Sequence, residues 1–82
     1  MDGIDSRPIE LDLSGLKCPL PALRTRKALR ALPAGGSLVV TCTDPMAAID
    51  IPNLVREEGG RLETSETAGA TLRFTIRRSA PS

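Results

Sequence analysis

Cys18 is the residue of this chain best suited to chemistry, and Pro19 and Pro21 follow it closely. Proline fits the first turn of a helix, where backbone N–H groups have no partner within the helix, and breaks a helix one turn later. The sequence therefore predicts that Cys18 caps a helix beginning at Pro19. The free N–H groups of Leu20 and Ala22 and the positive end of the helix dipole would then favour the nucleophilic thiolate. We expect the pKa of the Cys18 thiol to lie well below that of a free cysteine.

The composition excludes most other catalytic chemistry. The 82 residues include no histidine, tyrosine or tryptophan and only two cysteines. Ser–His and Cys–His nucleophiles are therefore absent, and neither a zinc site nor any other metal or cofactor is expected. Two cysteines far apart in a reducing cytosol do not form a disulfide framework. Sulfur is the strongest candidate for any chemistry here.

Length and charge indicate one small domain over residues 9–78, with tails at 1–8 and 79–82. A net charge of +1 gives no general attraction to nucleic acid or to a membrane surface. No apolar run approaches the length of a membrane span, and residues 1–8 lack the basic start and apolar middle of a secretory signal. We expect a soluble, cytoplasmic protein that is monomeric when free.

The elements that would position Cys18 form a strand–helix–strand unit. Apolar and polar residues alternate over 9–13, as in a strand with one buried face, and Ser14-Gly15 ends it with a turn. A helix is expected from Pro19 to about residue 32, and a second strand over 37–42. A right-handed crossover makes these strands parallel, so the residues after the second strand, Thr43 and Asp44, should come near Cys18.

The second half of the chain completes a two-layer sandwich. A short turn is expected over residues 46–49, followed by a helix with Asp50 as its cap and Pro52 in its first turn. Residues 61–66 and 71–78 predict a hairpin. The order is therefore β-α-β-α-β-β, a two-layer α/β sandwich.

The first predicted helix has an apolar arc and a basic surface. The arc that would face the core contains Ala22, Thr25, Ala28, Leu29 and Leu32. Four basic residues and two leucines lie off this arc, and they are either an ordinary solvated surface or a docking face for an acidic partner. With the lysine before the cysteine, the candidate partner-binding residues are Lys17, Leu20, Leu23, Arg24, Arg26 and Lys27.

These residues resemble the TusA-type sulfur-carrier family, also called SirA-like. The resemblance covers about residues 9–78 and depends on the Cys-Pro-X-Pro motif from Cys18 to Pro21. It also depends on Leu11-Asp12 and Gly15-Leu16 before the motif, and on features after it. Those features are Arg26-Lys27, Gly35-Gly36, Thr43-Asp44-Pro45 and Asp50-Ile51-Pro52. The resemblance implies a four-stranded mixed sheet with two helices on one face.

The resemblance also implies a function. Cys18 would accept sulfane sulfur as a persulfide from a donor protein, a cysteine desulfurase or a rhodanese-like protein, and pass it to an acceptor protein. The sulfur would end in tRNA thiolation, cofactor biosynthesis or sulfur oxidation. Pro19 and Pro21 would be structural residues of the motif and Asp44 a supporting residue. Leu20 stands where some members have glutamate, which makes this site more apolar.

Alternatives remain open for several residues and for the function. Cys42, on the inward face of a strand, is either an inert core residue or a partner of Cys18 in a disulfide. Asp44 and Asp50 are expected to cap helices, and Met46 to pack. A regulatory interaction module with an unused cysteine is the alternative function. RNA binding is disfavoured because the one aromatic residue, Phe74, is expected to face inward.

Overall fold

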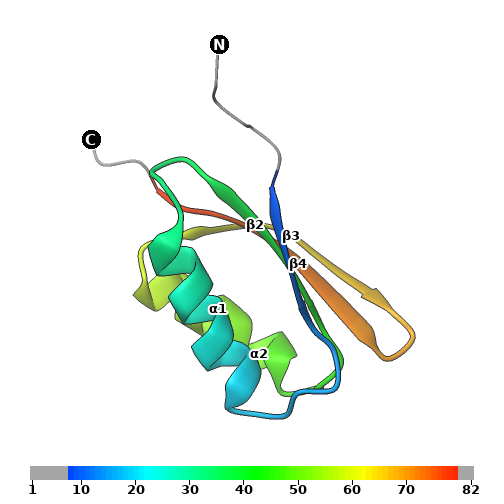
Figure 1. Cartoon of the computed structure of the whole chain (residues 1–82). Helices are drawn as coiled ribbons and strands as arrows, with labels where there is room; N and C mark the ends of the chain where they lie inside the picture. The colour runs from blue at the N-terminus through cyan, green and yellow to red at the C-terminus, as the bar shows by residue number, and fades with distance from the viewer. Residues whose placement is uncertain (1–7, 80–82) are drawn as a thin grey trace.

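The computed structural model describes residues 8–79, which form a sheet covered by helices on one face (Figure 1). The two predicted tails therefore fall almost wholly outside the described residues. Neither helix in the described part is long and apolar enough to cross a membrane. The predicted α/β sandwich is confirmed. Its elements in chain order are β1 (Ile9–Leu13), α1 (Leu20–Ala31), β2 (Ser37–Cys42), α2 (Ala47–Glu57), β3 (Arg61–Ala68) and β4 (Thr71–Arg77).

The four strands form one mixed sheet in the order β1-β2-β4-β3. β1 pairs with β2 in parallel, with Leu13 opposite Cys42, as the strand–helix–strand unit predicts. β4 is antiparallel to both β2 and β3. β2 is therefore a central strand. Leu38 and Val40 belong to the core cluster, and Val39, which lies between Glu10 and Thr75 of the neighbouring strands, is also buried.

The core lies between the sheet and the helices. Phe74, the one aromatic residue, is 1% exposed in β4 and packs in the same cluster as Leu38 and Val40 of β2. From the helices, Leu29, Ile51 and Val55 belong to the same cluster. Aliphatic side chains thus fill most of this core, whereas aromatic side chains contribute more to the cores of many other proteins.

The hairpin differs slightly from its predicted bounds. β3 extends to Ala68, so the connection shrinks to Gly69 and Ala70, and Gly69 takes the positive φ of 60° that a tight two-residue turn needs. The pairing register shifts between Leu62 and Thr64, which is a bulge. Figure 1 shows the hairpin extending beyond the layer of helices.

α2 is longer than the sequence predicts, and Asp50 does not cap it. The helix begins at Ala47, because the Asp44 side chain accepts the Met46 N–H at 3.0 Å and the Asp44 carbonyl accepts the Ala47 N–H at 2.9 Å. Pro52 therefore stands inside the helix. The carbonyl left without a helical donor is that of Ala48, an exposed residue, so water can bond it.

Two arginines hold the ends of the helices that lie away from Cys18. Arg30 of α1 forms a bidentate ion pair with Glu58 at the end of α2, at 2.7 and 3.0 Å. The Arg78 guanidinium donates to three carbonyl groups at the end of α1, with the shortest bond, 2.6 Å, to the Arg30 carbonyl. A helix end leaves its last carbonyls without the usual helical partners, and here the Leu29 carbonyl also accepts the Leu32 N–H at 3.2 Å.

Replacing Arg78 with alanine is expected to lower the free energy of unfolding by roughly 1–3 kcal/mol, because part-buried carbonyls lose a charged donor. Urea denaturation measures this change. Arg73→Ala is the matched control, since Arg73 is exposed on β4, the strand that ends just before Arg78, and donates no side-chain hydrogen bond within residues 8–79. Equal free energies of unfolding for the two variants would contradict the stabilising role of Arg78.

Candidate functional site

Both helices begin at the same edge of the sheet, where β1 and β2 end (Figure 1). Cys18 lies in the loop between β1 and α1, and its side chain is exposed. Two hydrogen bonds fasten this loop to the segment after β2. The Gly15 N–H donates to Thr43 Oγ1 at 2.8 Å, and the Cys18 N–H donates to an Asp44 carboxylate oxygen. The predicted proximity of Thr43 and Asp44 to Cys18 is confirmed.

Asp44 joins the cysteine loop to the start of α2. One of its oxygens accepts the Cys18 N–H, and the other accepts the Met46 N–H. An aspartate before proline commonly accepts the N–H two residues on, because its short side chain reaches that group. The N-cap of α2 is Met46, so the prediction that Asp44 caps the helix is wrong; Asp44 instead forms a turn with Met46 and bonds the Cys18 N–H.

The role predicted for Asp50 from the sequence, that of a helix cap, is wrong. Asp50 lies in the first part of α2, and its own N–H bonds to the Met46 carbonyl within the helix. Its Oδ2 lies 3.2 Å from Cys18 Sγ, within range of a hydrogen bond from the thiol. The position of Pro52 suggested a helix starting at Asp50, and that error hid the carboxylate facing the sulfur.

The Cys18 thiol has a pKa above its ordinary value, and the expectation of a lowered pKa is wrong for the free protein. The hydrogen bond to Asp50 is the main cause; partial desolvation and the negative charges of Asp50 and Asp44 act in the same direction. The amino terminus of α1 does not offset these effects, because N–H groups near the sulfur already have other acceptors. The Leu20 N–H bonds to the Lys17 carbonyl at 2.9 Å, and the Cys18 N–H bonds to Asp44.

The two prolines occupy slightly different positions from those predicted. α1 begins at Leu20, so Pro19 is its N-cap and Pro21 its second residue. The Cys18–Pro19 peptide bond is cis. Pro21 is buried against the core and Pro19 is exposed. Pro21 thus packs the first turn of α1 while Cys18 stays at the surface.

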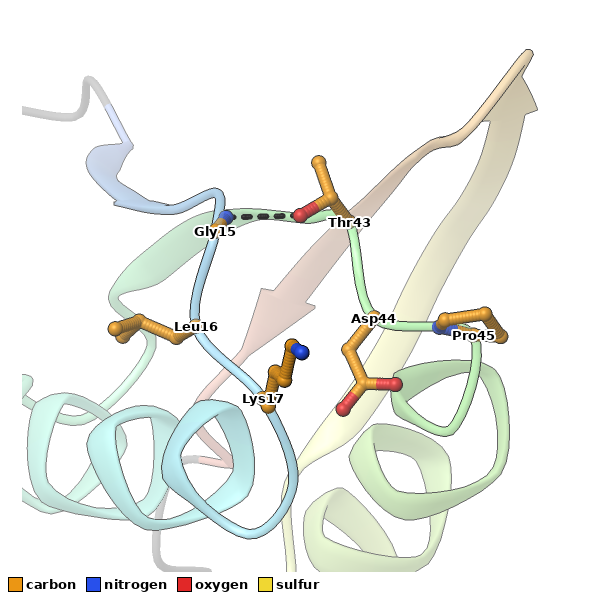
Figure 2. A pocket seen from close by; sticks show the side chains of 6 residues that line it. All are labelled: Gly15, Leu16, Lys17, Thr43, Asp44 and Pro45. Carbon is orange, nitrogen blue, oxygen red and sulfur yellow. Dashed lines mark hydrogen bonds between the residues drawn. The ribbon is translucent and has the colours of Figure 1, made fainter.

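A shallow hollow adjoins Cys18 on the side of β1 and β2. Figure 2 shows the Lys17 and Asp44 side chains extending into it, with the Gly15–Thr43 hydrogen bond at its rim. Leu16 and Pro45 complete the lining. Of the predicted partner-binding residues, Lys17 lines this hollow together with Asp44.

The other predicted partner-binding residues separate into three groups. Leu20 and Leu23 are exposed by 42% and 48%. Arg24 and Lys27 line a second hollow beside Leu11 of β1.

Arg26 belongs to the third group, because its Nε lies 3.7 Å from a Glu58 oxygen. It therefore faces α2 and does not extend freely from the basic surface. This is a correction to the predicted helix face, whose basic residues were all placed at the surface. The sequence could not show that Glu58 would lie across from Arg26.

Sequence reasoning missed two exposed apolar residues at the start of α2. Met46 is 47% exposed and Ile49 is 58% exposed, although Met46 was expected to pack. Their exposure was not predicted because the start of the helix was placed at Asp50. With Leu20 and Leu23, they form the exposed apolar residues contributed by the two helices.

Cys42 is fully buried in the core cluster, and burial raises its pKa to about 11. The negative charges of Asp44 and Asp12 act in the same direction. Both cysteines are free thiols. In residues 8–79, no cluster of histidine, cysteine, aspartate or glutamate could hold a metal ion.

The family model described as sulfurtransferase TusA matches residues 9–78, from the first residue of β1 to just after β4. The chain belongs to the TusA family. The matched residues include Cys18, Asp44 and Asp50.

Two relatives place the chain more closely. It is 41% identical over 70 residues to the sulfur carrier protein TusA of Allochromatium vinosum, covering 85% of this chain and 92% of that protein. The crystal structure of a SirA-like protein from Desulfitobacterium hafniense is similar with a TM-score of 0.76 and 28% identity. That match covers 87% of this chain and 97% of the other. The TusA-like and SirA-like resemblance predicted from the motif is confirmed.

In the free protein, alkylation of Cys18 by iodoacetamide is expected to rise with pH through a midpoint above that of a free cysteine. Only the thiolate reacts, and a raised pKa leaves less thiolate at neutral pH. A pH series with peptide-level mass spectrometry measures this midpoint, with glutathione as the reference thiol. A midpoint at or below that of glutathione would contradict it.

Cys42 is expected to stay unmodified under the same conditions in the folded protein, because it is buried and its pKa is about 11. Alkylation in denaturant provides the positive control. A Cys18–Cys42 disulfide after mild oxidation, detected by mass spectrometry, would instead support the redox pairing considered from the sequence.

Proposed function

We propose that this protein is a sulfur carrier that accepts sulfane sulfur as a persulfide on Cys18 and passes it to an acceptor protein. The observation that carries the proposal is the exposed Cys18 side chain on a loop whose backbone is fixed by Asp44 and Thr43. Thiol–persulfide exchange requires access by another protein and a fixed sulfur, and this loop supplies both. Family membership and the name of the Allochromatium vinosum relative support the same chemistry.

The partners follow from the chemistry of the transfer. A donor must present a cysteine persulfide, as cysteine desulfurases and rhodanese-like proteins do, and an acceptor must present a thiol or another sulfur-accepting group. The exposed leucines of α1, Leu20 and Leu23, offer apolar contact beside the cysteine. Lys17, Arg24 and Lys27 add positive charge around them. A cytoplasmic location, where both thiols stay reduced, is part of the proposal.

The supporting residues of the site act on the position of the sulfur. Asp44 fixes the Cys18 backbone through its N–H, and the buried Pro21 anchors the turn that follows. Pro19 sets the start of α1 directly after the cysteine. The transferred atom thus reaches the surface from a rigid support, which reduces the conformational freedom lost on docking.

Incubation with glutathione persulfide is expected to add the mass of one sulfur atom to the protein, at Cys18 and reversibly by dithiothreitol. Intact-protein mass spectrometry measures the gain. Cys18→Ser should abolish it, whereas Cys42→Ser, if folded, should retain it. Cells carrying Cys18→Ser should lose function. Full function of that variant in cells would favour the interaction module with an unused cysteine.

A further inference from the structure

Two carboxylates approach Cys18 from different parts of the fold. Asp44, in the loop after β2, bonds its N–H, and Asp50, on α2, faces its sulfur at 3.2 Å. Within residues 8–79, neither carboxylate forms an ion pair with a lysine or arginine. Lys17, the residue before the cysteine, is the basic side chain nearest in the chain, and it extends into the hollow beside Asp44 (Figure 2).

This arrangement is unusual for a nucleophilic cysteine. Reactive cysteines commonly lie beside basic groups that stabilise the thiolate, whereas negative charge beside sulfur disfavours it. A carboxylate instead stabilises the neutral thiol by accepting its proton in a hydrogen bond. The free protein therefore holds Cys18 in its less reactive form, which limits reaction with small electrophiles and oxidants.

We propose that Asp50 keeps Cys18 as a neutral thiol in the free protein, and that a basic side chain of the sulfur donor releases the thiolate by pairing with Asp50 on docking. The inference rests on the proposed function only in taking Cys18 as the reacting group. It adds a positioning residue, Asp50, and the chemistry of the partner surface that must face it. An arginine or lysine pairing with Asp50 engages the acceptor of the thiol proton and neutralises one of the two negative charges beside Cys18.

The transfer step balances without an oxidant. The Cys18 proton passes to water or to a basic group of the donor. Sγ then forms a bond to the outer sulfur of the donor's persulfide, and the S–S bond within that persulfide breaks. The donor cysteine leaves as a thiolate and takes up a proton. One S–S bond replaces another, so nothing is oxidised or reduced overall.

The surroundings of Asp50 define the rest of the partner surface. Met46 lies four residues before Asp50 on α2, hence on the same face of the helix, and is 47% exposed. Leu20, two residues after Cys18, is 42% exposed. A partner surface with one basic side chain among apolar ones complements this arrangement, because apolar contact excludes water and strengthens the ion pair.

Asp50→Asn tests the first half of the proposal. The substitution keeps the shape of the side chain and removes its charge, so iodoacetamide should alkylate Cys18 about tenfold faster at pH 7, with the pH midpoint lowered by about one unit. Thermal unfolding checks that the variant folds. A merely structural role for Asp50 would leave the midpoint unchanged, and that result would overturn the proposal.

Met46→Lys tests the second half by placing a cation one helical turn from Asp50. Cys18 should then be alkylated several-fold faster than in wild type, whereas the neutral control Met46→Gln should match wild type. In the Asp50→Asn background, lysine at position 46 should add much less than in wild type, since its effect acts through Asp50. An equal gain in both backgrounds, or no gain in either, would contradict the role of the partner cation.

These measurements do not depend on sulfur transfer. Should Cys18 fail to take up sulfur from glutathione persulfide while Asp50→Asn still lowers its pH midpoint, the proposed function fails and the role of Asp50 stands. Normal loading with an unchanged midpoint would instead overturn the role of Asp50 and leave the sulfur-carrier function standing. The two proposals are thus separable with the same set of purified variants.

Discussion

The parallel pairing of β1 with β2 is the constraint on which the site depends. Parallel strands joined by a helix end at one edge of a sheet, so the loop after β1 and the loop after β2 must meet there. The first loop contains Cys18 and the second contains Asp44. Residues 26 positions apart in the sequence thereby share a hydrogen bond, and the helix that follows the second loop brings Asp50 to the sulfur.

Two opposing electrostatic influences meet at this edge. The amino-terminal ends of both helices favour negative charge. The structure uses that preference for carboxylates, since Asp44 accepts an N–H at the start of α2 and another from Cys18. The sulfur therefore shares its surroundings with fixed negative charge. The reactivity of the Cys18 thiol therefore depends on these carboxylates as well as on its place beside the start of α1.

Local sequence pattern predicts the elements well where one face of each is buried. The alternation in β4 and the apolar arc of α1 follow directly from burial, so their positions are predictable. In β1 the alternation predicts the strand, although Leu13 is buried and Ile9 is exposed. Pro52 led to a wrong prediction of where α2 begins. A proline is tolerated inside α2 because the carbonyl that it leaves without a helical donor belongs to Ala48, an exposed residue. That single error displaced Asp50 and Met46 together. The direction of the Cys18 pKa shift could not be predicted for a related reason. The shift depends on side-chain contacts between residues far apart in the sequence, whereas the local sequence shows only that Cys18 precedes a helix.

The outer strand β3 has features that bear on whether it can pair with a strand of another chain. A strand at the edge of a sheet has unpaired backbone groups on one side, which invite pairing with another chain. β3 carries a bulge after Leu62, and Glu63 there forms an ion pair with Arg77 at 3.0 Å. Irregular geometry and charge make this edge a poor template for strand addition. Of the two outer strands of the sheet, β3 is therefore poorly suited to pair through its free edge with a strand of a second chain.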